Sequence, residues 1–195
     1  MAFLSRDEIV RSLTGAWHVF IDRPDADRYF DLSVTGFWRS FRAVVLVLPA
    51  YVLSTLTAWT TLPAEADENL FILAKAVSLA IDWVAFPVVL ALIADRLRVS
   101  ATYSAYVIVR NWGSVIATAP FGVLALLYVL GLIGQEVTGT LSLAILFVVL
   151  RYNYLIARRV LQVGVPLAIG IVAADFILSL AIDAGIGGLF GMPME

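Results

Sequence analysis

The sequence predicts an all-α membrane protein: a polytopic transmembrane helical bundle of five spans, with its N-terminus in the cytoplasm and its C-terminus outside. Three observations lead to this fold class: the composition, five apolar segments of spanning length, and the placement of the arginines. Of the 195 residues, 62% are hydrophobic and 14% are charged, whereas a soluble domain has about 45–50% apolar and about 25% charged residues. Lipid is therefore expected to replace water over much of the surface.

The composition also excludes several classes of function. The chain has no cysteine, which rules out disulfides, thiolate metal sites and cysteine nucleophiles. Its single histidine, His18, excludes a multi-histidine metal site. A net charge of -2 provides no basic field for nucleic acid. Since no phosphate-binding, dinucleotide-binding or hydrolase motif is present, we predict no enzyme, no cofactor and no metal site.

The five spans are the segments long and apolar enough to cross about 30 Å of hydrocarbon, which takes about 20 residues. They are Ala43–Leu62, Leu70–Ile93, Ser114–Ile133, Thr138–Ala157 and Val165–Asp183. The connectors between them are short, so consecutive spans are expected to pack as neighbours. The chain thus divides into a cytoplasmic N-terminal segment, 1–42, and a five-span transmembrane domain, 43–195.

Orientation follows from the basic residues, because Lys and Arg concentrate in cytoplasmic loops. The segment before the first span and the connectors after the second and fourth spans hold Arg6, Arg11, Arg23, Arg28, Arg39, Arg42, Arg96, Arg98, Arg110, Arg158 and Arg159. The opposite side holds only acidic charges, namely Glu65, Asp67, Glu68, Glu136 and Glu195. This asymmetry predicts a multi-pass protein of the cell (inner) membrane with the N-terminus inside.

A short amphipathic helix is expected in the N-terminal segment. Ser5 and Glu8 are spaced as in a capping box, and Ile9, Leu13 and Trp17 follow on one helical face. This pattern predicts either a helix lying on the inner membrane face or one that packs under the bundle.

A second interfacial helix is predicted in the middle of the chain. Ala101–Trp112 is apolar, but counting it as a span would reverse the orientation of everything that follows. We therefore interpret it as a helix at the cytoplasmic interface, where its Tyr and Trp side chains are suited to the depth. One long helix from Ala101 to Ile133 is the alternative.

Ionisable side chains within the spans need an explanation, because they are costly in lipid and normally face the bundle interior or water. Asp82 lies near the middle of the second span with Lys75 seven residues earlier, and Asp175 lies near the middle of the fifth with Asp183 eight residues later. The two spans run antiparallel, so Asp82 and Asp175 lie at similar depth. Lys75 is placed to pair with Asp183 or to bridge toward Asp82. Arg151 on the fourth span either reaches toward the midplane or snorkels to the cytoplasmic surface.

These five residues, Asp82, Asp175, Lys75, Arg151 and Asp183, are the candidates for an ion or proton relay. Two carboxylates close together in a low dielectric do not easily both stay ionised, an arrangement suited to handling a proton or a cation. The alternative is that the same groups only pair with one another and fix the register of the helices. The first span adds a mildly polar strip, formed by Tyr51, Ser54, Thr55 and Ala58.

The layout of five spans after a long polar N-terminal segment resembles the YIP domain family. The resemblance implies a small five-span membrane protein of a kind linked, in eukaryotes, to vesicle trafficking and membrane shaping. The aspartate-leucine-tyrosine-glycine-proline signature of the eukaryotic members is absent, and Tyr29-Phe-Asp-Leu-Ser33 is the nearest stretch. The resemblance is one of topology, and it transfers no functional residue.

Two functions follow from these observations. The first is a non-catalytic accessory, scaffold or membrane-organising protein, whose partners are the lipid bilayer and another membrane subunit or a second copy of the chain. The second is a small proton- or cation-coupled transporter, or a subunit of one, in which Asp82 and Asp175 carry the coupling ion. Coupling through both carboxylates needs them within about 4–6 Å of each other or in one wet cavity.

Overall fold

The computed structural model describes residues 4–60, 62–63 and 66–191, and within these ranges the chain is all-helical. Glu65 and Glu195, counted above among the acidic residues of the outer side, lie outside the described residues. In chain order the elements are α1 (Arg6–Phe20), the 3-10 helix η1 (Ala26–Tyr29), α2 (Val34–Ser40), the 3-10 helix η2 (Phe41–Ala43), α3 (Val44–Trp59), α4 (Glu68–Leu97), α5 (Ser100–Val129), α6 (Gln135–Val160) and α7 (Val165–Leu189).

Five helices within the described ranges are long and apolar enough to cross a membrane: the continuous run Val34–Trp59, which joins α2 and η2 to α3, and the four helices α4 to α7. Each overlaps one of the five predicted segments, although the first begins nine residues earlier than predicted, at Val34, and the third begins fourteen residues earlier, at Ser100. Large apolar side chains such as Leu92, which is 78% exposed, remain uncovered on the outside of the bundle, as lipid contact requires. The prediction of a five-helix membrane bundle is confirmed, while the direction in which it crosses the membrane stays a prediction.

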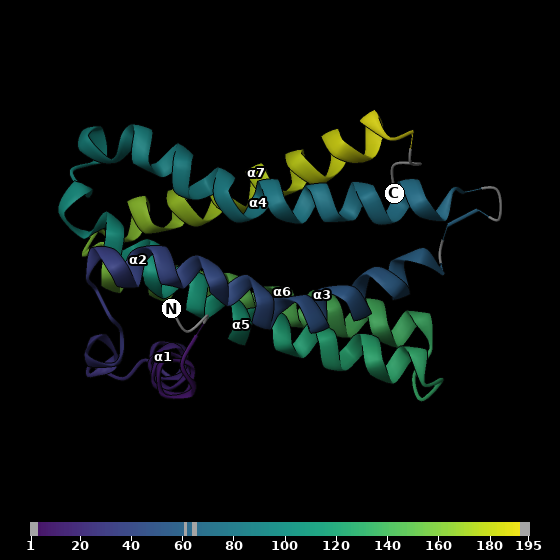
Figure 1. The fold of residues 1–195 in the computed structure, drawn as a ribbon, viewed down its shortest axis with the longest axis horizontal. Coiled ribbons are helices and arrows are strands. Elements are labelled where there is room, and N and C mark those ends of the chain that lie inside the picture. The colour runs from purple at the N-terminus through teal and green to yellow at the C-terminus, as the bar shows by residue number, and fades with distance from the viewer. Residues whose placement is uncertain (1–3, 61, 64–65, 192–195) are drawn as a thin grey trace.

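The long helices lie along one common axis in two groups (Figure 1). One group is the pair α4 and α7; the other contains α3, α5 and α6, with α5 packed between α3 and α6. The fully buried side chains concentrate toward the end where α1 lies: in α6 they begin only at Tyr152 and run to Val160. At the opposite end the helices are less closely packed, and this is the part of the bundle that contains the polar cavity described below.

The α4–α5 connection corrects one prediction. Ala101–Trp112 is not a separate interfacial helix but the first part of α5, which is unbroken from Ser100 to Val129. A tight turn with Arg98 in the left-handed conformation, φ 59°, ends α4 and reverses the chain. The alternative of one long helix is therefore the correct one, although it ends before Ile133. The prediction of a separate interfacial helix failed because Arg110 was counted as a loop residue, whereas its side chain pairs with Asp175 inside the bundle.

Both α4 and α5 have 30 residues, which at 1.5 Å per residue is about 45 Å. This exceeds the roughly 30 Å of hydrocarbon in a bilayer. The two helices therefore project beyond the apolar layer or cross it at a tilt.

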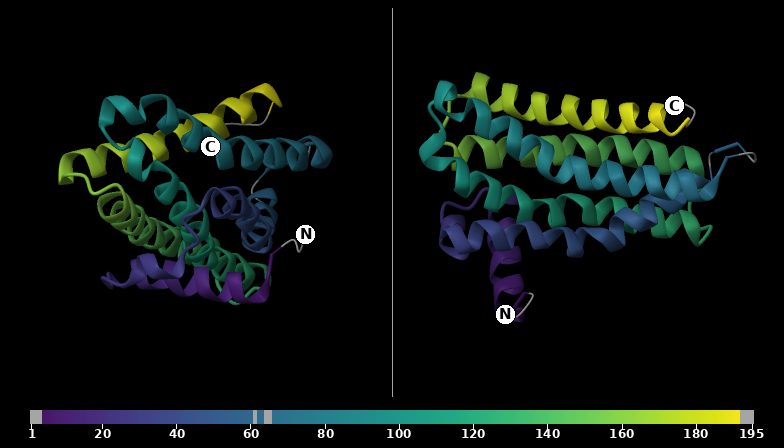
Figure 2. Two further views of the ribbon diagram at one scale, coloured as in Figure 1. Left: turned by 60° about the vertical axis from the view of Figure 1, so that its left-hand side comes forward. Right: turned by 45° about the horizontal axis from the view of Figure 1, so that its top comes forward.

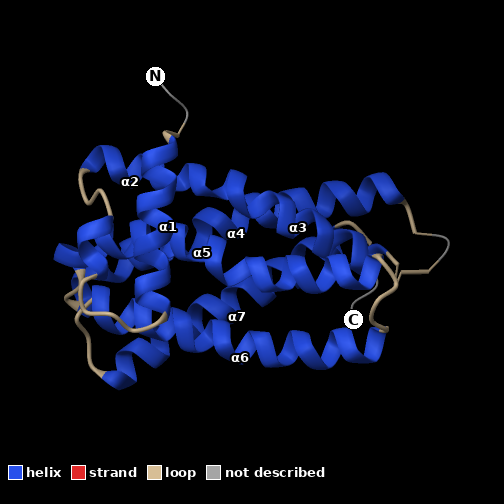
Figure 3. Cartoon of the chain, turned by 90° about the horizontal axis from the view of Figure 1, so that it is seen from below, coloured by secondary structure: helices blue, strands red, loops and turns tan. Residues whose placement is uncertain are grey.

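Helix α1 begins as predicted, since the hydroxyl of Ser5 accepts a hydrogen bond from the N–H of Glu8 at 3.1 Å. The helix lies across the bundle, nearly perpendicular to the long helices (Figure 2, right), and crosses α5 and α6 when seen from below (Figure 3). The helix packs against the bundle, in contact with α5 and α6, while its placement on the inner membrane face stays a prediction. Its buried face consists mainly of small residues, including Ser12, Gly15 and Ala16, whereas Trp17 from the predicted apolar stripe is 48% exposed.

Candidate functional site

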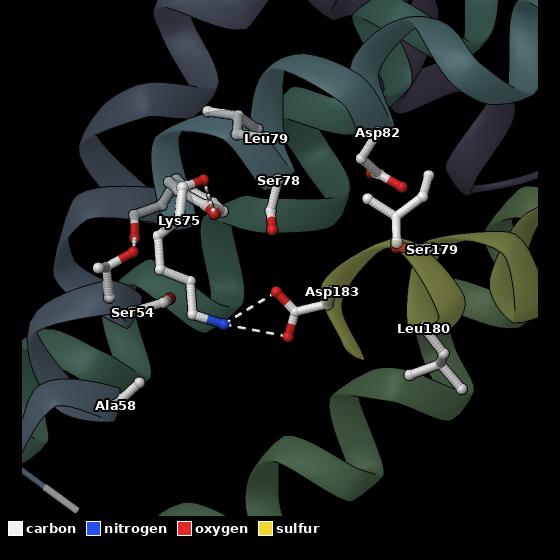
Figure 4. Close-up of a pocket in the computed structure, with 12 residues that line it drawn as sticks. Ser54, Ala58, Lys75, Ser78, Leu79, Asp82, Ser179, Leu180 and Asp183 are labelled. Carbon is white, nitrogen blue, oxygen red and sulfur yellow. Dashed lines mark hydrogen bonds and ion pairs between the residues drawn. The ribbon is translucent and has the colours of Figure 1, made fainter. Parts of the chain in front are cut away.

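A row of polar side chains follows the interface between α4 and α7. On α7 the row consists of Asp175, Ser179 and Asp183, which are spaced four residues apart and therefore share one helical face. Asp82 and Lys75 of α4 lie opposite (Figure 4). The polar faces of these two helices therefore meet, which is the condition under which Lys75 can pair with Asp183.

The end of the row nearer to the start of α7 is an ion pair between α5 and α7. Nη2 of Arg110 lies 2.8 Å from Oδ1 of Asp175, and Nε of Arg110 donates to Oδ2 at 3.2 Å. The two side chains are only 12% and 15% exposed, and the guanidinium also lies 5.6 Å from the centre of the Phe86 ring. Such a two-point contact between guanidinium and carboxylate is strong and orients both groups. It neutralises the charge of Asp175 within the bundle.

The other end of the row is the pair Lys75–Asp183, which the sequence predicted. Nζ of Lys75 donates to Oδ1 of Asp183 at 2.9 Å and to Oδ2 at 3.0 Å. This pair is more open than the first, with Lys75 28% and Asp183 55% exposed. Like the first, it joins two helices that are far apart in the sequence.

Asp82 lies between the two pairs. It is half-buried and lies beside Ser179 of α7 (Figure 4). Arg110, Asp175 and Asp183 are all close enough to act on its charge. Among the residues that the structure describes, Asp82 belongs to no ion pair, so it is the carboxylate of the row that is not directly neutralised by a cation.

A cavity of about 330 Å³ opens beside Asp82 between α3, α4 and α7. Its wall includes Asp82, Ser78 and Ser179, and Lys75 and Asp183 also line it. The mildly polar strip of the first span completes the wall, with Tyr51, Ser54, Thr55 and Ala58. The hydroxyl of Tyr51 donates to the carbonyl of Lys75 at 2.8 Å and so ties α3 to α4. Asp175 does not line this cavity.

The structure brings four of the five candidate residues into the row and separates the fifth from them. Arg151 is exposed on α6, and its Nη1 lies 3.4 Å from the carbonyl oxygen of Phe20, the last residue of α1. A basic side chain at a helix C-terminus is favourable because the last carbonyls lack partners within the helix. Arg151 therefore interacts with the N-terminal segment and not with Asp82 or Asp175.

The functional residue that the sequence analysis missed is Arg110. The rule that basic residues mark cytoplasmic loops assigned it to a connector, which concealed its role as the partner of Asp175. The signal that identifies it is its position: it is the one charged residue in the apolar stretch Ala101–Trp112.

No group of three metal-ligating side chains occurs among the described residues. Comparisons with protein-family models, curated proteins and solved structures found no match. The site is therefore interpreted from its geometry alone, and the likeness to the YIP domain family stays a prediction.

Proposed function

We propose that this chain is a non-catalytic accessory or scaffold protein of the membrane, whose intramembrane charges hold its helices in register. The observation that supports this proposal is the pairing of cations with carboxylates along the α4–α7 row. The Arg110–Asp175 pair links positions 65 residues apart, and the Lys75–Asp183 pair links positions 108 residues apart. Removing one member of the nearly buried Arg110–Asp175 pair leaves an uncompensated charge, so this pair opposes sliding of α7 along its neighbours. The more exposed Lys75–Asp183 pair adds a weaker contact.

The position of the two midplane carboxylates also favours this proposal over coupling through both of them. Arg110 occupies both oxygens of Asp175. The cavity beside Asp82 is lined without any contribution from Asp175. A mechanism that passes an ion between the two carboxylates would have to break the Arg110–Asp175 pair at every cycle.

The proposal is tested by asking what the protein binds in its own membrane. Wild-type protein purified in mild detergent or in nanodiscs after brief cross-linking is expected to retain a second membrane subunit or a second copy of itself. A double variant, Arg110→Met with Asp175→Leu, should retain the same partner, because an apolar pair of similar volume can replace a buried ion pair. A chain that purifies alone and as a monomer, from cells whose growth does not change when it is deleted, would contradict the proposal.

A proton- or cation-coupled transporter is the second candidate, and the observation that favours it is the placement of Asp82. Its carboxylate lies at a polar cavity beside the hydroxyls of Ser78 and Ser179, and it has no ion-pair partner in the described part of the chain. Oxygen ligands of this kind suit a proton or a hard cation.

A flux assay on liposomes tests this second function. Coupled transport predicts flux in the wild type, loss of flux in Asp82→Asn, and unchanged flux in Asp95→Asn. Asp95 is the matched control because it is a carboxylate near the end of the same helix, where it accepts a hydrogen bond from Ser100. Absence of flux in the wild type, or equal flux in all three proteins, would exclude the transporter.

A further inference from the structure

A second cavity, separate from the polar row, lies on the outside of the bundle where α1 crosses α5 and α6. It has a volume of about 410 Å³, and its lining is almost entirely apolar. Trp17 and Phe20 of α1 form its rim, and the groove continues along α5 at Ala119 and Pro120 and along α6 at Val148. We call this cavity the α1 groove.

The rim of the α1 groove is a set of three aromatic side chains. Trp17 stacks on Phe20 with ring centres 5.1 Å apart, and Phe20 meets the edge of Tyr152 at 5.4 Å. The hydroxyl of Tyr152 donates to the carbonyl of Ala16 at 2.8 Å, which fixes α1 against α6. Trp is enriched at the depth of the lipid headgroups, and Trp17 is the exposed member of this set, at 48%, so its side chain is suited to that depth.

Next to the groove, at the C-terminal end of α1, lies a cation that has no carboxylate partner among the described residues. Arg151 contacts the carbonyl of Phe20, and it forms no ion pair within the described ranges. The other arginines of α6 are engaged: Arg159 pairs with Asp22 at 2.9 Å, and Arg158 donates to the carbonyl of Val163 at 2.6 Å. A guanidinium has five N–H donors and matches a phosphate in geometry, so most of the binding capacity of Arg151 remains available.

We propose that the α1 groove binds an anionic phospholipid of the bilayer, with one acyl chain along α5 and α6 and the phosphate on Arg151. The apolar lining complements the chain, and the exposed guanidinium complements the charge. A lipid bound in this way bridges α1 to the bundle and so contributes to the docking of the N-terminal segment. The proposal is independent of whether the polar row is structural or carries an ion.

Native mass spectrometry of the full chain released from vesicles of equal parts phosphatidylglycerol and phosphatidylcholine tests this inference. Wild-type protein is expected to retain phosphatidylglycerol in preference to phosphatidylcholine. Arg151→Gln should lower the retained phosphatidylglycerol by about tenfold, the effect of losing one charge-assisted contact. Arg151→Lys should restore part of it. Arg158→Gln is the matched control, since its side chain lies on the same helix but contacts Val163, and it should behave as the wild type.

A second variant separates the groove from the charge. Ala119→Trp keeps Arg151 but fills the groove, and it should lose the retained phosphatidylglycerol while its helix content stays that of the wild type. Three results would overturn the inference: equal retention of the two lipids by the wild type, which indicates bulk lipid only; unchanged retention in Arg151→Gln; or unchanged retention in Ala119→Trp.

Discussion

Arg110 and Asp175 form the most buried ion pair between the long helices in the described part of the chain. Both side chains are nearly buried, and their charges cancel through two N–H donors. In a low dielectric, an ion pair of this kind costs about as much to desolvate as it gains by attraction. The pair therefore adds little to the net free energy of unfolding. Its main effect is to disfavour any other arrangement of the helices, because such an arrangement would separate the two charges.

We predict that neutralising one partner is worse than neutralising both. Asp175→Asn or Arg110→Gln alone should lower the free energy of unfolding in detergent micelles by about 3 kcal/mol, the typical cost of an unpaired buried charge. The double variant Arg110→Gln with Asp175→Asn should recover most of this lost free energy of unfolding. Denaturant unfolding followed by circular dichroism measures the three values, and equal destabilisation by the single and double variants would contradict a specific pair.

A second prediction at the residue scale concerns pH and the start of α2. Hydrogen bonds from the hydroxyl and the N–H of Ser33 hold the pKa of Asp31 below its usual 3.8. Because the folded pKa is lower than the unfolded one, the stabilisation is complete above the unfolded value and is lost as the pH falls through the folded one. Asp31→Asn should therefore lower the free energy of unfolding at pH 7, by less than about 1 kcal/mol because solvent screens this site. The difference from wild type should shrink as the pH falls below 3.8, as unfolding curves at pH 7 and at successively lower pH values will show.

The residue scale also shows what the sequence reveals about a site and what it conceals. The Lys75–Asp183 pair was predictable, because helical spacing and antiparallel spans place the two groups at one depth. The partner of Arg110 was not predictable. In a sequence, an arginine near the end of a span has the same surroundings whether its side chain faces water or a carboxylate on a helix later in the chain. Only the packing of α5 against the bundle decides between the two.

At the scale of elements, small residues set how closely the helices approach. A Cβ added at Gly122 of α5 would lie 2.6 Å from the Cβ of Ala50 on α3, which is closer than atoms can pack. Membrane helices gain much of their association from such close backbone approach. The same principle explains why the buried face of α1 was not predictable. The spacing of its large apolar side chains predicted one face, whereas α1 contacts the bundle through the small residues Ser12, Gly15 and Ala16.

We therefore expect Gly122→Ala to separate α3 from α5. The added methyl group has no room, so the cost should be about 1–3 kcal/mol of unfolding free energy, the range for overpacking a tight contact. Gly139→Ala on α6 is the control, because no atom lies within 4 Å of its added Cβ. Thermal unfolding in one detergent compares the melting temperatures of the two variants. Equal melting temperatures would contradict the prediction, because they would show that α3 and α5 accommodate the methyl group without loss of stability.

For the molecule as a whole, the helix ends alternate so that the two kinds of loop charge lie at opposite ends. Arg96 and Arg98 close α4 at the end where α1 lies. Asp67, Glu68 and Glu136 lie where α4 and α6 begin, at the other end. The number and order of the spans were predictable from length and apolarity. The length of α5 was not, because the arginine count placed its first turns in a loop.

The orientation in the membrane is testable by labelling single introduced cysteines. The sequence contains no cysteine of its own, so no other residue of the chain reacts with a thiol reagent. A membrane-impermeant maleimide should label Glu136→Cys in intact cells and should label Arg6→Cys only after the membrane is opened. Both side chains are exposed, so access to the reagent depends on the side of the membrane alone. The reverse pattern would show that the basic end faces outward.

The Arg110–Asp175 pair also has a consequence for the order in which the protein is made. Asp175 follows Arg110 by 65 residues, which at about 5–20 residues per second of synthesis is an interval of roughly 3–13 s. During that time α5 carries a cation whose final partner does not yet exist. Asp82, already synthesised and within electrostatic reach of Arg110, is a carboxylate available to balance it. We therefore expect Asp82 to be the carboxylate nearest to Arg110 until α7 is made, and Asp82→Asn to slow membrane insertion of the nascent chain more than Asp95→Asn does.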